Sequence, residues 1–285
     1  MPDTLTVALL QLTSGIDPAG NARQVCDLID AAAERGADWV LTPEMTLCLD
    51  KSRRRLLSNT HAEPDDPGLK AVCERAAARA IHVLIGSMAV RVGPASDGTE
   101  KLANRSLLIG PDGAIQARYD KIHLFDVTVS ETESYRESRL YAPGDAAVVA
   151  QTPWGGVGLS VCYDVRFPHL YRALGQAGAG LLTVPSAFTV PTGRAHWHVL
   201  LRARAIETGC FVLAPAQGGD HGDGRSTYGH SLVVDPWGEI VLDAGAARPE
   251  TTPGLHLADL DLAAIDRTRQ RIPSLNHGRA FRVPE

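Results

Sequence analysis

The chain has 285 residues, of which 44% are hydrophobic and 21% are charged, so it can bury a large core. A formal net charge of −5 and a longest basic run of three arginines, at 53–55, exclude the basic surface typical of nucleic-acid-binding proteins. The N-terminal residues lack a signal-peptide pattern, and no apolar run reaches the length of a membrane span. We therefore expect one globular domain over residues 1–285, with neither nucleic-acid nor membrane partners.

The cysteine content indicates the redox environment. The chain has an odd number of cysteines and no C-x-x-C spacing, which argues against a disulfide framework and against a structural zinc site. Reduced thiols are typical of the cytoplasm, and we expect that location. The five are Cys26, Cys48, Cys73, Cys162 and Cys210.

Apolar periodicity predicts strands that alternate with helices along the chain. Strands are expected at 6–10, 39–42, 81–85, 155–161, 181–184, 210–214 and 255–260. Helices are expected at 21–35, 67–80, 168–176, 195–208 and 261–271. Turn sequences at 111–113 and 235–238 predict two hairpins, which join 103–109 to 114–118 and 231–234 to 239–242. This pattern predicts an α/β fold with mixed sheets.

Three further segments are predicted to be irregular. Residues 126–141 are polar and are expected to form a loop over a site. Residues 88–100 show no regular pattern. A glycine-rich stretch lacks nucleotide-binding spacing, so we expect a mobile loop there. Its glycines are Gly218, Gly219, Gly222 and Gly224.

Three chemically competent residues each follow a predicted strand, and they are Glu44, Lys121 and Cys162. Taken singly, each has an ordinary interpretation, as a loop carboxylate, a surface charge and a small core residue. Because ligands bind at the carboxyl edge of α/β sheets, we expect the three side chains to meet at such an edge.

Together these three residue types suit nucleophilic catalysis. A thiol is mostly protonated at neutral pH, so it needs a base, and the oxyanion formed on attack needs a positive charge. Glu44 would be the base, Lys121 the cation and Cys162 the nucleophile. The helix predicted from Pro168 is expected to lower the pKa of the thiol, and burial is expected to raise the pKa of Glu44 toward neutrality. Such a set opens an amide or a nitrile through a thioester.

Histidines provide two alternatives. Any of His123, His196, His198 and His230 could instead pair with Cys162. His196 and His198 also suggest a metal site, but residues two apart on a helix point in nearly opposite directions. No metal is therefore expected.

The motifs around these residues resemble those of the nitrilase superfamily of carbon–nitrogen hydrolases, and in particular its Nit branch. Three of them match in order the motifs that carry the family's glutamate, lysine and cysteine, and the resemblance covers nearly the whole chain. They are Pro43-Glu44, Tyr119-Asp120-Lys121-Ile122-His123-Leu124 and Val161-Cys162-Tyr163-Asp164. Further matches include Pro185-Ser186-Ala187-Phe188, Gly193-Arg194-Ala195-His196-Trp197 and Asp235-Pro236-Trp237-Gly238.

The resemblance implies an α-β-β-α sandwich that forms a homodimer through the helical face carrying the segment after the cysteine. It implies that Lys121 and the backbone N–H of Tyr163 stabilise the oxyanion. Glu137 would be a second carboxylate that positions the lysine or the substrate. No metal or organic cofactor is implied.

The resemblance also suggests the substrate. Cys162-Tyr163-Asp164 is the amidase-like form of the cysteine motif, and the Nit branch hydrolyses amides of 2-oxo acids. Deaminated glutathione is the favoured substrate, and 2-oxoglutaramate is the alternative. Arg166 is expected to bind a substrate carboxylate, unless it forms a structural salt bridge. Phe188 and Thr189 are expected to contact the substrate.

Other functions stay open from the sequence. The same residues would serve a carbamoylase, a nitrilase or an amide-group transferase. The non-enzymatic alternative is a catalytically inert binding protein with this fold.

Overall fold

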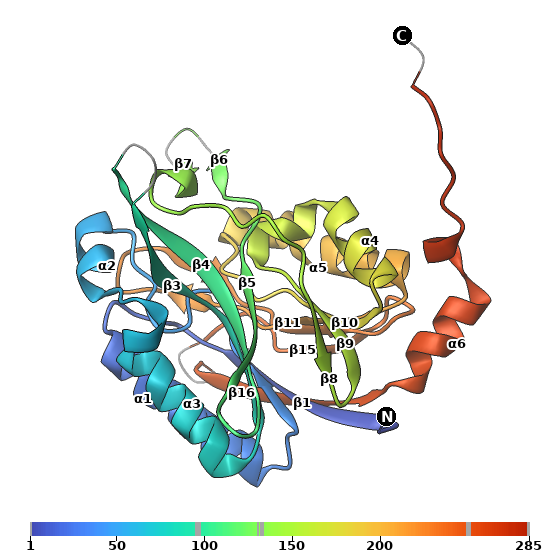
Figure 1. Cartoon of the computed structure of the whole chain (residues 1–285), viewed down its shortest axis with the longest axis horizontal. Coiled ribbons are helices and arrows are strands. Elements are labelled where there is room, and N and C mark those ends of the chain that lie inside the picture. Colours follow the sequence, from blue (N-terminus) through green and yellow to red (C-terminus); the bar gives the residue numbers. More distant parts are fainter. Residues whose placement is uncertain (1, 95–97, 130, 132–133, 249–251, 284–285) are drawn as a thin grey trace.

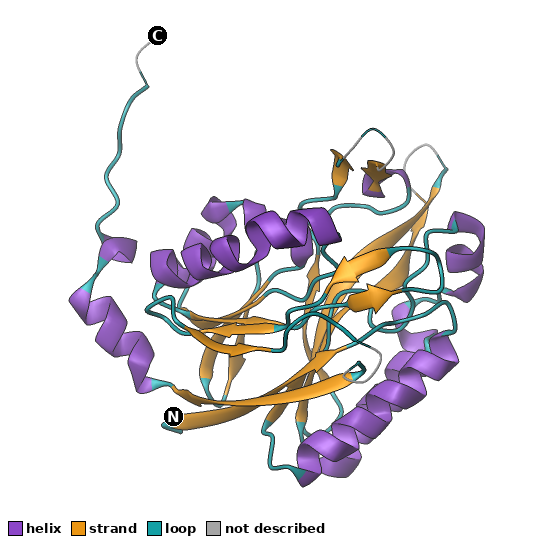
Figure 2. Cartoon of the chain, turned by 180° about the vertical axis from the view of Figure 1, so that it is seen from behind, coloured by secondary structure: helices purple, strands orange, loops and turns teal. Residues whose placement is uncertain are grey.

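The computed structural model describes residues 2–94, 98–129, 131, 134–248 and 252–283. In this part of the chain two six-stranded sheets stack face to face, with helices on their outer sides (Figure 1). Helices α1 (Pro18–Glu34) and α3 (Pro67–Arg79) cover the first sheet, and α4 (Pro168–Gln176) and α5 (Val190–Thr208) cover the second. Figure 2 shows the same layers from behind. The expected α-β-β-α sandwich is confirmed.

The first sheet is mixed. Strands β1, β2 and β3 pair in parallel, and the other neighbours pair antiparallel. In spatial order its strands are β16 (Gly254–Asp261), β1 (Thr4–Gln11), β2 (Trp39–Leu41), β3 (His82–Pro94), β4 (Glu100–Ile109) and β5 (Ile115–Asp120).

The second sheet is mixed in the same way. Strands β9, β10 and β11 pair in parallel, and the outer neighbours pair antiparallel. In spatial order its strands are β15 (Ile240–Asp243), β14 (Leu232–Val234), β11 (Phe211–Ala214), β10 (Ala179–Thr183), β9 (Gly155–Leu159) and β8 (Val149–Thr152).

The alternation of side chains along each strand explains why both faces of a sheet are packed in layers, because successive side chains of a strand point to opposite faces. In β1, Val7 and Leu9 enter the core that also contains side chains of the second sheet. Ala8 and Leu10 point the other way and pack in a second core with α1 and α3. A strand that is apolar at every position therefore indicates a sheet covered on both sides.

Proline explains why two helices begin earlier than predicted. Helix α1 starts at Pro18, after Asp17, whose side chain accepts a hydrogen bond from the Ala19 N–H. Helix α5 starts at Val190, not at 195, and Pro191 lies in its first turn. Proline fits a first turn because the N–H that it lacks would have no helical partner there.

The segments predicted to be irregular contain short regular elements, so these expectations were wrong in part, although Gly222 and Gly224 do lie in a loop, at 221–225. The glycine-rich stretch forms a hairpin of β12 (Gly218–Asp220) and β13 (Ser226–Tyr228). In the 126–141 stretch, β6 (Asp126–Thr128) pairs with β7 (Ser134–Arg136), and a 3-10 helix follows at Glu137–Arg139. In the 88–100 segment, β3 continues to Pro94 and β4 begins at Glu100, while 95–97 lie outside the described residues. Hydrogen bonding to a neighbouring strand stabilises these strands, although their own sequences show no strand periodicity.

The remaining elements lie around the sandwich. They are α2 (Arg53–Asn59), α6 (Ala263–Arg271) and 3-10 helices at Glu63–Asp65, Cys162–Arg166 and Ser274–Asn276. The described residues beyond the last of these extend away from the layers (Figures 1 and 2). No described helix is long and apolar enough to span a membrane.

Candidate active site

The three residues singled out in the sequence come from both sheets. Glu44 follows β2, and Lys121 follows β5 directly, both in the first sheet. Cys162 follows β9, in the second sheet. The expectation of one common sheet edge was therefore wrong, because the site forms where the strand ends of two stacked sheets meet.

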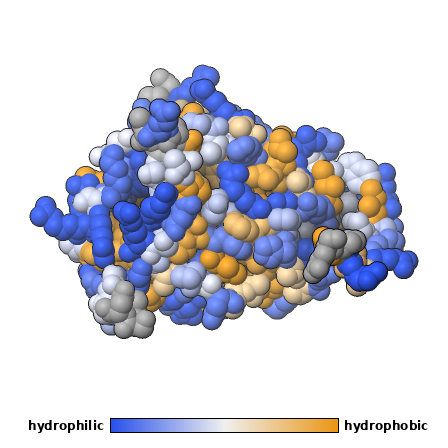
Figure 3. All heavy atoms as spheres, turned by 90° about the horizontal axis from the view of Figure 1, so that it is seen from above, coloured by the Kyte–Doolittle hydropathy of each residue, from blue (hydrophilic) through white to orange (hydrophobic). Residues whose placement is uncertain are grey.

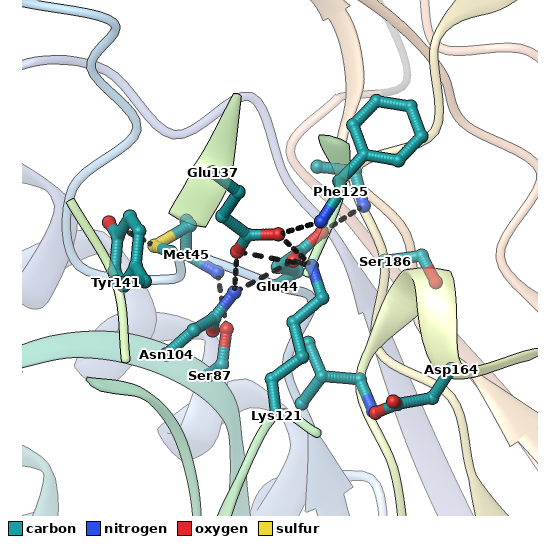
Figure 4. Close-up of polar contacts among 12 residues, drawn as sticks. Glu44, Met45, Ser87, Asn104, Lys121, Phe125, Glu137, Tyr141, Asp164 and Ser186 are labelled. Atoms are coloured by element: carbon teal, nitrogen blue, oxygen red, sulfur yellow. Dashed lines mark hydrogen bonds and ion pairs between the residues drawn. The ribbon is translucent and has the colours of Figure 1, made fainter. Parts of the chain in front are cut away.

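Lys121 lies between two carboxylates (Figure 4). Its Nζ donates to Glu44 Oε1 at 2.9 Å and to Glu137 Oε2 at 2.9 Å. The Lys121 side chain is only 2% exposed, and both carboxylates are nearly buried. Charge-assisted hydrogen bonds of this kind are strong and fix the positions of all three groups. Glu137, expected from the resemblance alone, thus lies beside the lysine.

Asn104 is a fourth member of the cluster that the sequence analysis missed. It lies buried in β4, and its Nδ2 donates to Glu44 Oε1 and to Glu137 Oε1, each at 3.0 Å. Its Oδ1 has no hydrogen-bond partner among the described residues. The strand also contains charged and polar residues, so Asn104 carried no distinctive signal in the sequence.

Backbone N–H groups complete the carboxylate contacts. The Ala187 N–H donates to Glu44 Oε2 at 3.0 Å, and the Phe125 N–H donates to Glu137 Oε2 at 2.7 Å. Both oxygens of Glu44 and both oxygens of Glu137 therefore accept hydrogen bonds. These hydrogen bonds hold the Glu44 carboxylate and the Glu137 carboxylate each in a single orientation.

Cys162 adopts an unusual backbone conformation. Its φ is 50°, in the left-handed region, and its N–H donates to the Pro185 carbonyl at 2.9 Å. A residue other than glycine rarely adopts this conformation, and such residues cluster at functional sites. Cys162 also begins a 3-10 helix, so Tyr163 is the second residue of that helix. Backbone N–H groups in a first turn have no helical partner and are available to a ligand.

Asp164 connects the cysteine segment to the lysine segment. Its Oδ2 accepts from the Tyr119 hydroxyl at 2.8 Å and from the Val161 N–H at 2.9 Å. Its Oδ1 accepts from the His123 N–H at 3.0 Å. Tyr119 and His123 lie on either side of Lys121 in the chain. This fully buried carboxylate therefore holds the segments of Lys121 and Cys162 together.

The four histidines considered as partners of Cys162 contact other groups. His123 Nδ1 lies 2.7 Å from Asp164 Oδ1, and His196 Nδ1 lies 3.3 Å from Arg166 Nη1. His198 and His230 both contact Asp243. Glu44, in contrast, forms a side-chain hydrogen bond with Cys162, which favours Glu44 as the partner of the thiol.

The electrostatics of the cluster correct two expectations. Burial and the Glu44 charge raise the pKa of the Cys162 thiol well above its ordinary value, and the opposing effects of Lys121 and of the Ala187 N–H are smaller. Burial also acts to raise the pKa of Glu44, but the Lys121 charge and hydrogen bonds from Lys121, Cys162 and Asn104 outweigh it. The pKa of Glu44 therefore lies below its ordinary value. The thiol is protonated and Glu44 is ionised in the free protein.

Lys121 keeps its charge despite its burial. Desolvation acts to lower the pKa of Lys121, but the Glu137 and Glu44 carboxylates outweigh it and hold this pKa well above its ordinary value. The site therefore holds a fixed positive charge next to a neutral thiol.

The residues expected to bind substrate lie next to the cysteine helix. The Arg166 guanidinium lies 5.8 Å from the centre of the Tyr163 ring and 5.4 Å from that of Phe188. No described carboxylate forms an ion pair with Arg166, which argues against the structural salt bridge. Thr189 precedes α5, and its Oγ1 lies 2.8 Å from Thr192 Oγ1, so this hydroxyl is already engaged in the first turn.

Two stacked mixed sheets between helix layers hold a cysteine, a lysine and two glutamates where the strands end, an arrangement that suits the class of hydrolases that use a nucleophile. The carbon–nitrogen hydrolase family model matches residues 6–270. The chain belongs to this family.

Known proteins agree with this assignment. A deaminated glutathione amidase from Synechocystis sp. is 40% identical over 273 residues, covering 95% of this chain and 96% of that protein. The C. elegans NitFhit crystal structure is 34% identical with a TM-score of 0.86, and it covers 97% of this chain and 65% of NitFhit. Saccharomyces cerevisiae Nit3, a solved member of branch 10 of the nitrilase superfamily, is 27% identical with a TM-score of 0.83, covering 99% of this chain and 98% of Nit3. The expected resemblance to the nitrilase superfamily and its Nit branch is confirmed.

Proposed function

We propose that this family member is a cysteine-dependent amidase that hydrolyses deaminated glutathione through a thioester. The observation that carries the proposal is the buried contact of Lys121 with Glu44 and Glu137 beside Cys162. The 40% identity to a deaminated glutathione amidase along nearly the whole chain supports the substrate.

The first half of the reaction forms the thioester. Glu44 accepts the proton of the Cys162 thiol as sulfur attacks the amide carbon. The charge that develops on the carbonyl oxygen is stabilised by the Lys121 ammonium and the Tyr163 N–H. Glu44 then passes its proton to the leaving amine, and the C–N bond breaks.

The second half of the reaction releases the acid. Glu44 removes a proton from a water molecule, which attacks the thioester carbon and forms a second oxyanion on the same donors. When this intermediate collapses, sulfur leaves and takes its proton back. With deaminated glutathione the acid released is 2-oxoglutarate.

The resting protonation state suits this cycle. A neutral thiol beside an ionised carboxylate becomes a nucleophile only when a carbonyl arrives to accept its electrons. Glu137 is not needed as an acid or a base and serves to hold Lys121 in place. Arg166 lies beside the cysteine helix without a carboxylate partner among the described residues, so we assign it to a carboxylate of the substrate.

We further propose that the protein acts as a cytoplasmic homodimer. All five cysteines are free thiols, as a reducing compartment allows. Seen from above, the face over α4 and α5 carries apolar side chains between polar ones (Figure 3). Val199 and Ile206 on α5 are 69% and 52% exposed, and Val241 on β15 is 47% exposed. A partner covering this face would remove them from water.

Substrate release measurements test the activity. We expect 2-oxoglutarate to be released from deaminated glutathione much faster than from 2-oxoglutaramate, and Cys162→Ala to release none. A faster reaction with 2-oxoglutaramate would identify an omega-amidase with the same machinery. Release by the Cys162→Ala variant would overturn the thioester mechanism.

A further inference from the structure

A second cluster of chemically reactive side chains lies outside the candidate active site. His198 lies on α5, His230 in the connection from β13 to β14, and Asp243 at the end of β15. One ligand atom from each residue lies within 4.8 Å of the other two. His198 Nε2 is 3.1 Å from Asp243 Oδ2, and His230 Nδ1 is 2.9 Å from Asp243 Oδ1.

A hydrogen-bonded framework holds these three segments together. The indole N–H of Trp197, next to His198, donates to the His230 carbonyl at 2.8 Å. The His230 N–H donates to the Gly245 carbonyl at 2.9 Å, and the Gly245 N–H donates to Asp243 Oδ1 at 2.8 Å. The positions of the three side chains are thus fixed by the backbone as well as by their mutual contacts.

The His230 ring is also oriented by its own backbone and by a neighbouring ring. Its φ of 55° lies in the left-handed region, where a residue other than glycine is strained. The Tyr228 ring stacks on the His230 ring with centroids 4.4 Å apart and planes at 20°. This arrangement presents Nδ1 to Asp243.

The cluster is partly exposed to solvent. The side chains of His198, His230 and Asp243 are 29%, 20% and 33% exposed. In the single chain all three side chains are therefore accessible from solvent.

We propose that His198, His230 and Asp243 bind one divalent transition-metal ion of the zinc class. Two imidazoles and a carboxylate are ligands that zinc prefers, and bonds of about 2.0–2.2 Å place tetrahedral ligand atoms about 3.3 Å apart. The two contacts of Asp243 are close to that spacing, and all three ligand atoms lie within 4.8 Å of one another, so side-chain rotations would complete the site. The fourth position remains for water.

The bound ion would tie α5 to β15 and to the β13–β14 connection. Helix α5 starts directly after Phe188 and Thr189, so the ion would stabilise an element that borders the candidate active site. Tertiary structure alone reveals this set. The helical spacing correctly excludes His196 as a partner of His198, whose partners lie 32 and 45 positions further along the chain.

Calorimetric titration with Zn²⁺ tests the proposal on the full chain after chelator treatment. We expect one ion per chain, a rise in melting temperature with Zn²⁺, and visible absorption bands of tetrahedral Co²⁺ when Co²⁺ replaces it. His198→Gln, His230→Asn and Asp243→Asn should each weaken binding by at least about 10-fold. Asparagine is chosen at 230 because it tolerates the left-handed conformation.

Two controls separate this site from others. Cys162→Ser removes the catalytic thiol as a ligand, and His196→Gln removes the neighbouring histidine of the same helix. Both should keep the affinity of the unaltered chain. Absence of binding at millimolar Zn²⁺, or binding that survives in Asp243→Asn and His198→Gln but is lost in Cys162→Ser, would overturn the proposal. If His230→Asn fails to fold, the Zn²⁺ affinities of His198→Gln and Asp243→Asn test the proposal.

Discussion

Two nitrogen donors, Lys121 Nζ and Asn104 Nδ2, are shared by the two buried carboxylates Glu44 and Glu137. The single positive charge of Lys121 thus contacts two negative charges, and the Asn104 amide and the backbone N–H groups of Ala187 and Phe125 supply the remaining hydrogen bonds. Burying a charge without partners costs several kcal/mol, so each donor matters for the protonation state of the base. The ionised state of Glu44 beside the protonated Cys162 thiol therefore depends on these hydrogen-bond donors.

Asn104→Ala should lower kcat/KM by about 10- to 100-fold, the effect of losing one hydrogen bond to a charged group. Because the Asn104 amide helps to lower the pKa of Glu44, its loss should also move the acid limb of the kcat/KM profile to higher pH. Asn104→Asp, which adds a third carboxylate, should move that limb further. Kinetics from pH 4 to 9 measure both effects. An unmoved acid limb in both variants would remove Asn104 from the site chemistry.

The pH profile of the unaltered enzyme tests the protonation states. Glu44 must be ionised to accept a proton, and its pKa lies below its ordinary value of about 4.3. Lys121 must be protonated, and its pKa lies above its ordinary value of about 10.4. We expect kcat/KM, which reports the free enzyme, to stay level from about pH 5 to 9 while the chain is folded by circular dichroism. An acid limb near pH 6 to 7 would mean that burial, not Lys121, controls Glu44.

At the scale of elements, the site depends on a close approach between strand ends. Gly86 in β3 packs so tightly that a Cβ there would lie within 3.0 Å of the Thr42 and Pro43 carbonyls and of the Pro185 ring. Thr42 and Pro43 precede Glu44, and the Pro185 carbonyl accepts the Cys162 N–H. The missing side chain therefore lets the glutamate and cysteine segments approach each other.

Gly86→Ala should lower the free energy of unfolding by about 1–3 kcal/mol, since overpacking forces the backbone to shift. Gly222→Ala is the matched control, because nothing lies within 4 Å of a Cβ at that position. Urea denaturation of both variants measures the difference. Equal stability of the two variants would show that the strand ends can separate without cost.

At the scale of the whole molecule, the proposed dimer depends on the exposed apolar side chains of α5 and β15. Ile206 lies against Gly238, in the turn before β15, so the helix and the hairpin form one continuous surface. The Arg202 Nε donates to the Gly238 carbonyl at 2.7 Å and fixes this contact. Exposed apolar side chains that gather on one face are typical of an interaction site, and Val199, Ile206 and Val241 support an interface here.

Val199→Asp together with Ile206→Asp should convert the proposed dimer to a monomer, because a charge buried in an apolar interface has no partner. Light scattering coupled to size-exclusion chromatography measures the mass. Val92→Asp is the control, since Val92 is 45% exposed on β3, outside this face. A dimer that persists in the double variant would place the interface elsewhere.

The sequence by itself determined the order of most strands and helices, the α/β class with mixed sheets, and the choice of Glu44, Lys121 and Cys162 as candidate residues. These follow from local periodicity and from residue chemistry at strand ends. The match of separated motifs to the nitrilase superfamily added the sandwich and pointed to Glu137. Each of these depends on the residues themselves or on their near neighbours.

Only the tertiary structure decided the rest. Asn104 lies 60 positions from Glu44, and the Ala187 N–H lies 143 positions from it, so no local pattern shows that they share one carboxylate. The pKa directions of Glu44 and Cys162 depend on whether desolvation or a neighbouring charge is larger, and that balance is set by distance and burial. His198, His230 and Asp243 also come from separate segments of the chain, so only the folded structure shows that they lie together. Contacts between distant segments exist only once the sheets have stacked.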